Sequence, residues 1–199
     1  MKDLSIFCIG DSLVYGYGVR RSQCWTGLLS ELTGAKVENC GINGDTTAGM
    51  LSRLHTWILP EMRKSSSGCC CAVILGGCND IFFTGSDLTA RENMVAMTMA
   101  LRAAGVRPIV CIPVGIGKSG FPEEWAALVD FRKSAKIMED YADWLAKYCA
   151  AFGIDCVDLR PAFAMAGEEF FLDGIHPGPE GQRIIAQSLC EVIAIIYGN

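Results

Sequence analysis

The stretch LSIFCIGDSL, at residues 4–13, places a short apolar run directly before a Gly-Asp-Ser turn. A β-prone run of this length that is closed by Gly10 predicts a strand. Residues 23–33 then carry apolar side chains at helical spacing and stop at Gly34, and residues 36–40 form a second short apolar run. The N-terminal part of the chain therefore predicts a strand, a helix and a second strand.

The same alternation continues toward the C-terminus. Three more apolar runs predict strands, and four stretches predict helices: strands at residues 70–75, 106–112 and 154–159, and helices at 46–59 (stopped by Pro60), 86–104, 123–152 (one helix or two) and 179–197. Strands separated by helices of this length are joined by right-handed crossovers and lie parallel. We therefore expect an α/β fold, a doubly wound three-layer α/β/α sandwich around a mainly parallel five-stranded sheet.

Composition limits the function classes. The 199 residues include 17 basic and 22 acidic side chains, which gives a net charge of −5, and 51% of the residues are hydrophobic. The length predicts a single domain spanning residues 1–199, with enough apolar side chains for a core. Because an acidic chain without a Lys/Arg cluster lacks the positive surface that nucleic acids require, we expect a small-molecule substrate and no nucleic-acid partner.

The hydropathy pattern bears on location. No apolar segment approaches the roughly 18 residues that cross a bilayer, and the N-terminal apolar run is shorter than the core of a signal peptide. The sequence therefore predicts no membrane span and a cytoplasmic location.

The cysteines are numerous but do not form a recognisable motif. The chain has 11 of them, an odd number, with no Cys-x-x-Cys pair. The run 69–71 alternates between the two faces of a predicted strand, so its thiols and that of Cys78 cannot converge on one ion. We expect free, mostly buried thiols, with no disulfide framework and no metal site.

Four polar blocks lie at the ends of predicted strands or directly before the last helix. They are the residues GDSL at 10–13, GINGD at 41–45, GCND at 77–80 and DGIHP at 173–177. In an open parallel sheet, ligands bind beyond the carboxyl ends of the strands, so these blocks are candidates for one site. In this order they resemble the GDSL, or SGNH, hydrolase superfamily, and the resemblance covers the whole chain. It implies a flavodoxin-like fold and an esterase, thioesterase, lysophospholipase or carbohydrate deacetylase activity.

Ser12 is the candidate nucleophile, and a serine hydroxyl needs a neighbouring base to take its proton. The chain has two histidines, and one of them, His55, falls inside a predicted helix away from any strand end. His176 is the remaining candidate. Asp173, three residues earlier, is close enough to bind the imidazole and orient it. The resemblance assigns the same roles to Asp173 and His176.

The resemblance also implies an oxyanion hole. Its donors would be the backbone N–H of Ser12, the backbone N–H of Gly44 and the side-chain amide of Asn79, and backbone N–H groups at a strand-to-helix turn are suited to this task. Gly41 is a second candidate for the glycine, although the following Asp-Thr favours Gly44.

Two further acids and one glycine-rich segment have supporting roles in this interpretation. Asp11 and Asp80 are expected to bind loop amides and position their neighbours. Residues 113–121 do not match the G-x-x-x-x-G-K-[ST] phosphate loop, so we expect them to form a wall on the acyl side of the cleft.

The sequence thus predicts a serine hydrolase that cleaves carboxylic esters, with thioesters or lysophospholipids as further possibilities, through a Ser-His-Asp triad and an acyl-enzyme, without a cofactor. The order and spacing of the blocks are most similar to the bacterial arylesterase, thioesterase I and lysophospholipase branch. Two alternatives remain, a carbohydrate O-deacetylase of the same superfamily and a flavodoxin-like module that binds a nucleotide or flavin. Asp11 disfavours the second, because a phosphate cradle does not place an acid there.

Overall fold

A computed structural model describes residues 3–64, 69–117, 121–166 and 170–198. Its centre is a five-stranded sheet in which all neighbouring strands are parallel and the order is β2-β1-β3-β4-β5. The strands are β1 (Leu4–Gly10), β2 (Lys36–Gly41), β3 (Cys69–Leu75), β4 (Arg107–Ile112) and β5 (Asp155–Asp158). The expected fold class is confirmed, and the strand order is the flavodoxin-like one.

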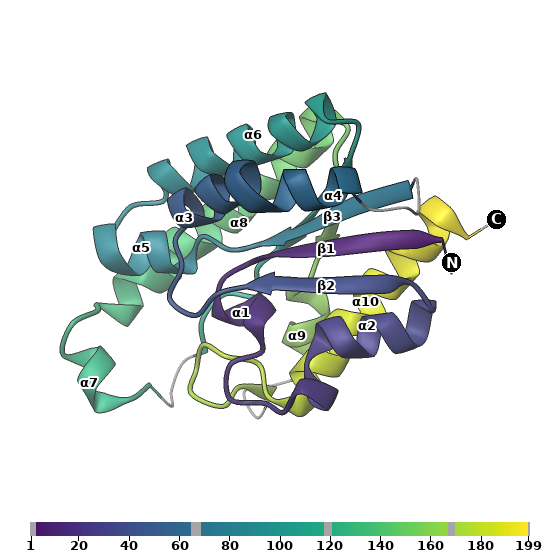
Figure 1. Ribbon diagram of the computed structural model, residues 1–199. Coiled ribbons are helices and arrows are strands. Elements are labelled where there is room, and N and C mark those ends of the chain that lie inside the picture. The colour runs from purple at the N-terminus through teal and green to yellow at the C-terminus, as the bar shows by residue number, and fades with distance from the viewer. Residues whose placement is uncertain (1–2, 65–68, 118–120, 167–169, 199) are drawn as a thin grey trace.

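Helices cover both faces of the sheet (Figure 1). One face carries α3 (Thr47–Arg53), α4 (Leu59–Lys64), α6 (Leu88–Ala103) and α8 (Phe131–Phe152), with α5 (Cys78–Thr84) beside them. The other carries α1 (Ser12–Tyr15), α2 (Trp25–Thr33), α9 (Arg160–Ala166) and α10 (Pro179–Tyr197). The short α7 (Glu123–Ala126) lies beyond the carboxyl ends of the strands.

The strand next to the chain's first functional block is the most enclosed part of the sheet. Every residue of β1 is buried, because the strand is sandwiched between β2 and β3 and covered by helices above and below. A strand buried on both faces reads as a continuous apolar run, which is the pattern at residues 4–9. The turn that follows β1 is therefore held on a rigid support.

The helix predicted for residues 46–59 does not end at Pro60, and this prediction was wrong. The chain passes from α3 through a π-helical segment, Leu54–Ile58, into α4, which continues to Lys64. In that segment the N–H of Leu59 binds the carbonyl of Leu54, five residues back. The wider turn accommodates the ring of Pro60 and its missing N–H, which would otherwise interrupt an α-helix.

The stretch 123–152 is two helices, α7 and α8, and α8 begins where the Asp130 side chain accepts the N–H of Lys133 at 3.0 Å. The short helices α5 and α9 were not predicted. Each spans only seven residues, which is too short for helical spacing to stand out in the sequence.

Within the described ranges, none of the helices combines the length and apolar character needed to cross a membrane. The cysteines whose side chains are described are free thiols, most of them buried. In the same part of the chain, no three His, Cys, Asp or Glu side chains gather in a way that could hold a metal ion.

A buried glutamine joins α2 to the segment that precedes α10. Gln182 is 1% exposed, accepts the backbone N–H of Trp25 at 2.9 Å and donates to the carbonyl of Pro177 at 3.1 Å. Trp25 is itself fully buried and donates its indole N–H to the carbonyl of Leu13 at 2.8 Å. Gln182 therefore links the start of α2 to the segment before α10, and Trp25 extends this link to the turn after β1.

We expect Gln182→Leu to lower the free energy of unfolding by about 2–4 kcal/mol, because it leaves a buried donor and a buried acceptor without partners. Urea denaturation measures the change. Gln23→Leu is the matched control, since its side chain accepts the Arg20 N–H at an exposed site and at 3.3 Å, and it should change stability little. Equal effects of the two substitutions would contradict the connecting role of Gln182.

Candidate active site

The candidate site lies at the carboxyl ends of β1, β2 and β3, next to the point where the strand order reverses. The turn after β1 holds Asp11 and Ser12, the loop after β2 holds Gly44, and α5 after β3 holds Asn79. The fourth block, with Asp173 and His176, precedes α10. All four blocks that were predicted from the sequence meet at this edge.

Close packing fixes the position of Ser12. A Cβ atom at Gly10 would lie 2.2 Å from the carbonyl oxygen of Leu75 and 2.3 Å from Cγ2 of Val14, so only glycine lets the turn pack this tightly on β3. Asp11 caps α1 by accepting the N–H of Leu13 at 2.9 Å. Ser12 is the first residue of α1, so its own N–H has no partner within the helix.

Ser12, His176 and Asp173 form one chain of hydrogen bonds. Nε2 of His176 lies 2.9 Å from Oγ of Ser12, and Nδ1 lies 2.7 Å from Oδ2 of Asp173. With the carboxylate accepting from Nδ1–H, the lone pair of Nε2 faces the serine hydroxyl. The arrangement can therefore remove a proton from Ser12.

Asp173 is held in its ionised form. Its Oδ1 accepts the backbone N–H groups of His176 at 2.8 Å and Ile175 at 3.1 Å. Burial raises the pKa of Asp173, but the bonds from the His176 ring and from these N–H groups outweigh burial and hold that pKa below its ordinary value. A carboxylate that stays ionised stabilises an imidazolium beside it.

Two aromatic rings enclose His176, which is 6% exposed. The ring of Tyr17 lies 4.4 Å from the imidazole between centroids, and the ring of Trp125 meets it edge-on at 5.9 Å. Neither residue was singled out from the sequence. The available signal was a tyrosine between two glycines, four residues after the end of the GDSL block, and a tryptophan in the segment after β4.

The candidate oxyanion donors also lie together. Gly44 has φ +74°, a backbone conformation that side chains rarely adopt, and it lines the cavity next to Ser12 and Asn79. The amide of Asn79 donates one hydrogen to the carbonyl of Asp45 at 2.8 Å and has a second to offer. Gly41, the other candidate, lies under α1, where a Cβ atom would be 2.2 Å from the N of Tyr15.

A cavity of about 600 Å³ opens beside these groups. One side holds Ser12, His176, Gly44 and Asn79, and the rest is mainly aromatic and aliphatic, formed by Leu13, Tyr17, Phe82, Phe83, Trp125, Leu128, Val129, Phe131 and Ile175. A polar reaction centre at the wall of an apolar cavity suits an ester with an apolar group.

The apolar wall is not where the sequence placed it. We expected residues 113–121 to form it, but none of the described residues of that stretch, 113–117 and 121, lines the cavity. Gly117 instead donates its N–H to the carbonyl of Gly174 at 2.7 Å and so supports the loop that carries His176. The wall comes instead from the loop after α1, from α5 and from four residues further along the chain, Trp125, Leu128, Val129 and Phe131. Residues 118–120 are outside the described part.

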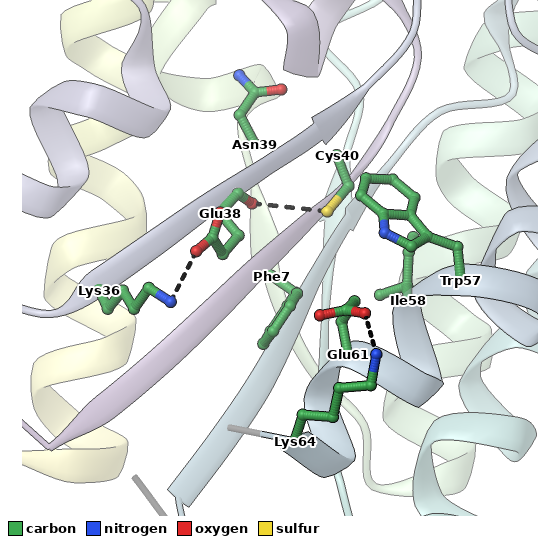
Figure 2. Close-up of a pocket in the computed structure, with 9 residues that line it drawn as sticks. All are labelled: Phe7, Lys36, Glu38, Asn39, Cys40, Trp57, Ile58, Glu61 and Lys64. Carbon is green, nitrogen blue, oxygen red and sulfur yellow. Dashed lines mark hydrogen bonds and ion pairs between the residues drawn. The ribbon is translucent and has the colours of Figure 1, made fainter. Parts of the chain in front are cut away.

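Figure 2 shows a second cavity, of about 280 Å³, between β2 and α4. Its charges are paired within the cavity, Lys36 with Glu38 at 2.9 Å and Lys64 with Glu61 at 2.7 Å. Burial raises the pKa of its Cys40 thiol to about 11, so the reactive thiolate is scarce at neutral pH. His55 lies on the same helical segment as this cavity's Trp57, is exposed, and takes no part in the Ser12 site.

Asp11 and Asp80 each accept a backbone N–H group, which agrees with the supporting roles expected from the sequence. The carboxylate of Asp80 accepts the N–H of Thr47 at 2.9 Å and its hydroxyl at 2.7 Å, which ties α5 to the loop after β2. Asp11 is fully buried, and its Oδ2 has no hydrogen-bond partner among the described residues. Burial, together with the nearby Asp80 and Asp45 carboxylates, raises the pKa of Asp11 to about 7.

Residues 8–184 match the family model described as the GDSL-like lipase/acylhydrolase family. The chain belongs to this family. Membership makes the protein an esterase-type hydrolase that acts on small ester substrates, in place of the nucleotide- or flavin-binding module that the fold alone allowed.

Two curated relatives of this GDSL-family protein are bacterial. The chain is 27% identical over 194 residues to "Thioesterase 1/protease 1/lysophospholipase L1" of Escherichia coli K12, a match that covers 92% of this chain and 79% of that protein. It is 28% identical over 111 residues to "Esterase TesA" of Pseudomonas aeruginosa, a match that covers 53% of this chain and 52% of that protein.

Solved structures show the same fold at lower identity. A member of the lipolytic protein G-D-S-L family from Veillonella parvula superposes with a TM-score of 0.81 at 20% identity, covering 96% of this chain and 98% of that one. A carbohydrate acetylesterase family member from Sinorhizobium meliloti gives a TM-score of 0.78 at 16% identity, covering 98% and 99%.

The raised pKa of Asp11 predicts how the stability of this GDSL-family protein depends on pH. Asp11 keeps its proton up to about pH 7 in the folded state, while an unfolded aspartate releases it near 3.8. Between these values the folded state binds more protons, so the contribution of Asp11 to stability falls as the pH rises through this window.

Asp11→Asn keeps an oxygen for the Leu13 N–H and removes the titration. The variant should gain stability relative to wild type from pH 4 to pH 8, on the order of 2–4 kcal/mol, as measured by urea unfolding across that range. Asp130→Asn, at the exposed start of α8, is the control and should follow the wild-type curve. An Asp11→Asn curve parallel to that of wild type would show that Asp11 is ionised throughout.

Proposed function

We propose that Ser12 is the nucleophile of a two-step ester hydrolysis, with His176 as the general base and acid and Asp173 as the residue that orients it. The observation that carries the proposal is the continuous hydrogen-bond chain from Asp173 through His176 to Ser12, at the wall of an apolar cavity.

In the first step Nε2 of His176 takes the proton of Ser12 while Oγ attacks the ester carbonyl carbon. The imidazolium that forms is stabilised by the Asp173 carboxylate, and the same proton then passes to the departing alcohol or thiol. In the second step His176 takes a proton from water while the water oxygen attacks the acyl-Ser12 ester, and it returns that proton to Oγ of Ser12 as the acyl–Oγ bond breaks and the acid leaves.

The negative oxygen of each tetrahedral intermediate is assigned to three donors: the N–H of Ser12, the N–H of Gly44 and the free amide hydrogen of Asn79. Gly44 and Asn79 line the cavity beside Ser12, which supports this assignment. Asn79 is already oriented by its bond to Asp45, so it needs little rearrangement when charge develops.

The apolar lining favours a substrate with an apolar acyl chain, either an ester, a thioester or a lysophospholipid. The printed name of the Escherichia coli relative, "Thioesterase 1/protease 1/lysophospholipase L1", agrees with this substrate class. A carbohydrate O-deacetylase is the second candidate, favoured by the structural neighbour that is named a carbohydrate acetylesterase family member. An apolar wall is a poor match for a sugar, so we place the acyl-chain substrate first.

Ser12→Ala should abolish turnover of p-nitrophenyl esters while the far-UV circular dichroism and thermal midpoint stay close to wild type, because the substitution removes one oxygen. A fluorophosphonate probe should label wild type stoichiometrically and leave Ser12→Ala unlabelled. Ser52→Ala, at an exposed serine of α3, is the control and should be labelled like wild type. Turnover or labelling that persists in Ser12→Ala would remove Ser12 from the reaction.

A series of p-nitrophenyl esters from acetate to dodecanoate tests the acyl-chain substrate. We expect kcat/KM to rise with chain length until the cavity is filled, because each buried methylene contributes up to about 0.8 kcal/mol. Phe82→Ser should flatten this rise by placing a hydroxyl in the wall, whereas Ile195→Ser, at an 85% exposed site on α10, should leave it unchanged.

The same series separates the two candidates. A deacetylase would turn over acetylated sugars faster than any longer ester, and its preference for acetate would not depend on Phe82.

A further inference from the structure

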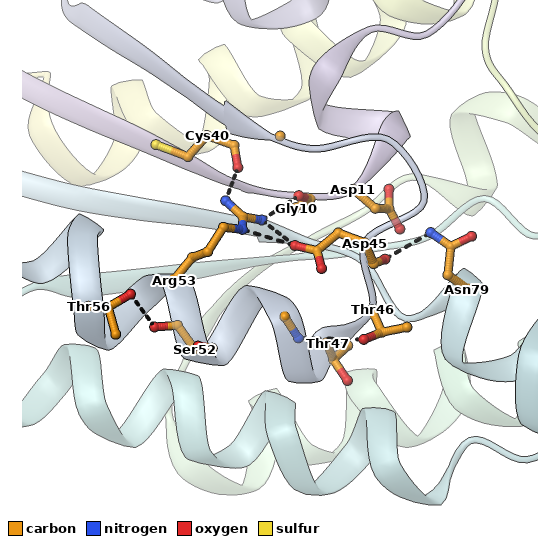
Figure 3. A network of polar contacts seen from close by, with 12 residues as sticks. Gly10, Asp11, Cys40, Asp45, Thr46, Thr47, Ser52, Arg53, Thr56 and Asn79 are labelled. Atoms are coloured by element: carbon orange, nitrogen blue, oxygen red, sulfur yellow. Dashed lines mark hydrogen bonds and ion pairs between the residues drawn. The ribbon is translucent and has the colours of Figure 1, made fainter.

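Arg53, the last residue of α3, spans the ends of two strands (Figure 3). Its Nη1 donates to the carbonyl of Cys40 in β2 at 2.7 Å, and its Nη2 donates to the carbonyl of Gly10 in β1 at 3.1 Å. The planar guanidinium thus ties the carboxyl end of one strand to that of the next.

The same guanidinium binds the loop that follows β2. Its Nε and Nη2 donate to Oδ2 of Asp45 at 2.9 and 2.6 Å, and both side chains are largely buried. Asp45 is confined from the opposite side as well, since a Cβ atom at Gly49 would lie 1.8 Å from its Oδ1. The position of Asp45 therefore depends on Arg53 and on the open space at Gly49.

Each candidate oxyanion donor is next to a group that Arg53 or Asp45 holds. Gly10 is two residues before Ser12, and Asp45 directly follows Gly44. The backbone carbonyl of Asp45 accepts the amide of Asn79 at 2.8 Å, so it sets the direction of that side chain (Figure 3). The three donors come from the segments after three different strands. Arg53 binds the first two segments directly and is linked to Asn79 through Asp45.

We propose that Arg53 is a positioning residue for the oxyanion hole. It does not line the cavity and acts through Gly10 and Asp45, setting the spacing between the N–H groups of Ser12 and Gly44 and the amide of Asn79. This inference rests on the proposed function, since it assigns a geometry to the donors that the proposed mechanism uses. Preorganised donors contribute mainly in the transition state, so losing their spacing lowers kcat rather than substrate affinity.

The guanidinium shape is essential to this role. Arg53 uses three nitrogens on three acceptors that lie in different directions, and a lysine ammonium at the end of a flexible chain cannot reproduce that fork. The fold has an independent tie at the same loop, the bonds from Thr47 to Asp80, so substitutions of Arg53 leave the loop attached to α5.

The test measures kcat and KM for Arg53→Lys, Arg53→Gln and Asp45→Asn. We expect kcat to fall about 10- to 100-fold in each, with KM within about two-fold of wild type, because misplaced donors cost nearly as much as a missing one. Titration with the fluorophosphonate probe gives the fraction of protein with a reactive Ser12. The value of kcat is then calculated per reactive site, so misfolded protein does not lower it.

Arg107→Gln is the matched control. Arg107 also pairs with a carboxylate, that of Asp155, but at the opposite end of the sheet, and its loss should leave kcat and KM at wild-type values. Gly49→Ala is the complementary variant, because it displaces the Asp45 carboxylate while Arg53 is intact, and it should lower kcat in the same way.

Two further readouts separate positioning from a general structural role. Affinity for a trifluoromethyl ketone, which forms a tetrahedral adduct on a serine, should fall in parallel with kcat/KM, while affinity for the carboxylic acid product stays at the wild-type value. In the double variant with Asn79→Ala, Arg53→Gln should lower kcat less than it does alone, because the donor that Arg53 positions is already absent.

The inference is overturned if Arg53→Lys keeps the wild-type kcat, if KM rises while kcat per labelled site is unchanged, or if the ketone binds the variants as tightly as wild type. The Ser12→Ala result distinguishes this failure from that of the proposed function. Turnover that survives in Ser12→Ala contradicts the proposed mechanism itself, whereas an inactive Ser12→Ala together with fully active Arg53 variants contradicts only the positioning role.

Discussion

The burial of β1 along its whole length is the constraint on which the site depends. Polar groups directly after a fully buried strand are shielded from water, so each needs a hydrogen-bond partner within the protein. The carbonyl of Gly10 is satisfied by Arg53, Oδ1 of Asp11 by the Leu13 N–H, and the hydroxyl of Ser12 by His176. The same demand that stabilises the turn therefore orients its reactive groups.

Among the described residues, one buried side-chain oxygen has no hydrogen-bond partner, and it belongs to Asp11. Oδ2 of Asp11 is buried, unpaired among the described residues and close to two other carboxylates, and the raised pKa of Asp11 is the physical consequence. A neutral carboxyl is far easier to bury than a charged one. Asp173, by contrast, keeps its charge because it accepts the imidazole N–H and two backbone N–H groups. Two aspartates at the same edge of the sheet thus have pKa values shifted in opposite directions because their hydrogen-bond partners differ.

The environment of His176 is built from segments far apart in the chain. Tyr17 comes from the loop after α1 and Trp125 from α7, and together they exclude water from the imidazole. Trp125 lines the cavity together with Leu128, Val129 and Phe131, so the segment that covers the imidazole also forms part of the apolar wall.

Local pattern was sufficient for much of the fold and for marking the residues of the candidate site. Alternating apolar runs and helical spacing predicted the five strands, and the strand-end blocks marked Ser12, Gly44, Asn79 and His176 before any coordinates, because parallel strands deliver their carboxyl ends to one edge. Pattern failed where the outcome depended on neighbours. Pro60 is accommodated by a π turn that no propensity indicates, and the bonds of Arg53 to two strand ends cannot be inferred from its place on a predicted helix. The sequence assigned residues 113–121 to the acyl wall. Only the packing of Gly117 on Gly174 shows that this segment supports the His176 loop instead.

The sequence by itself determined the layered fold and the residue types available at its edge, since both follow from periodicity and chain direction. Only the tertiary structure decided in which direction the pKa of each aspartate shifts, which rings cover the imidazole and which acceptors Arg53 binds, because these depend on distances between segments that periodicity does not encode.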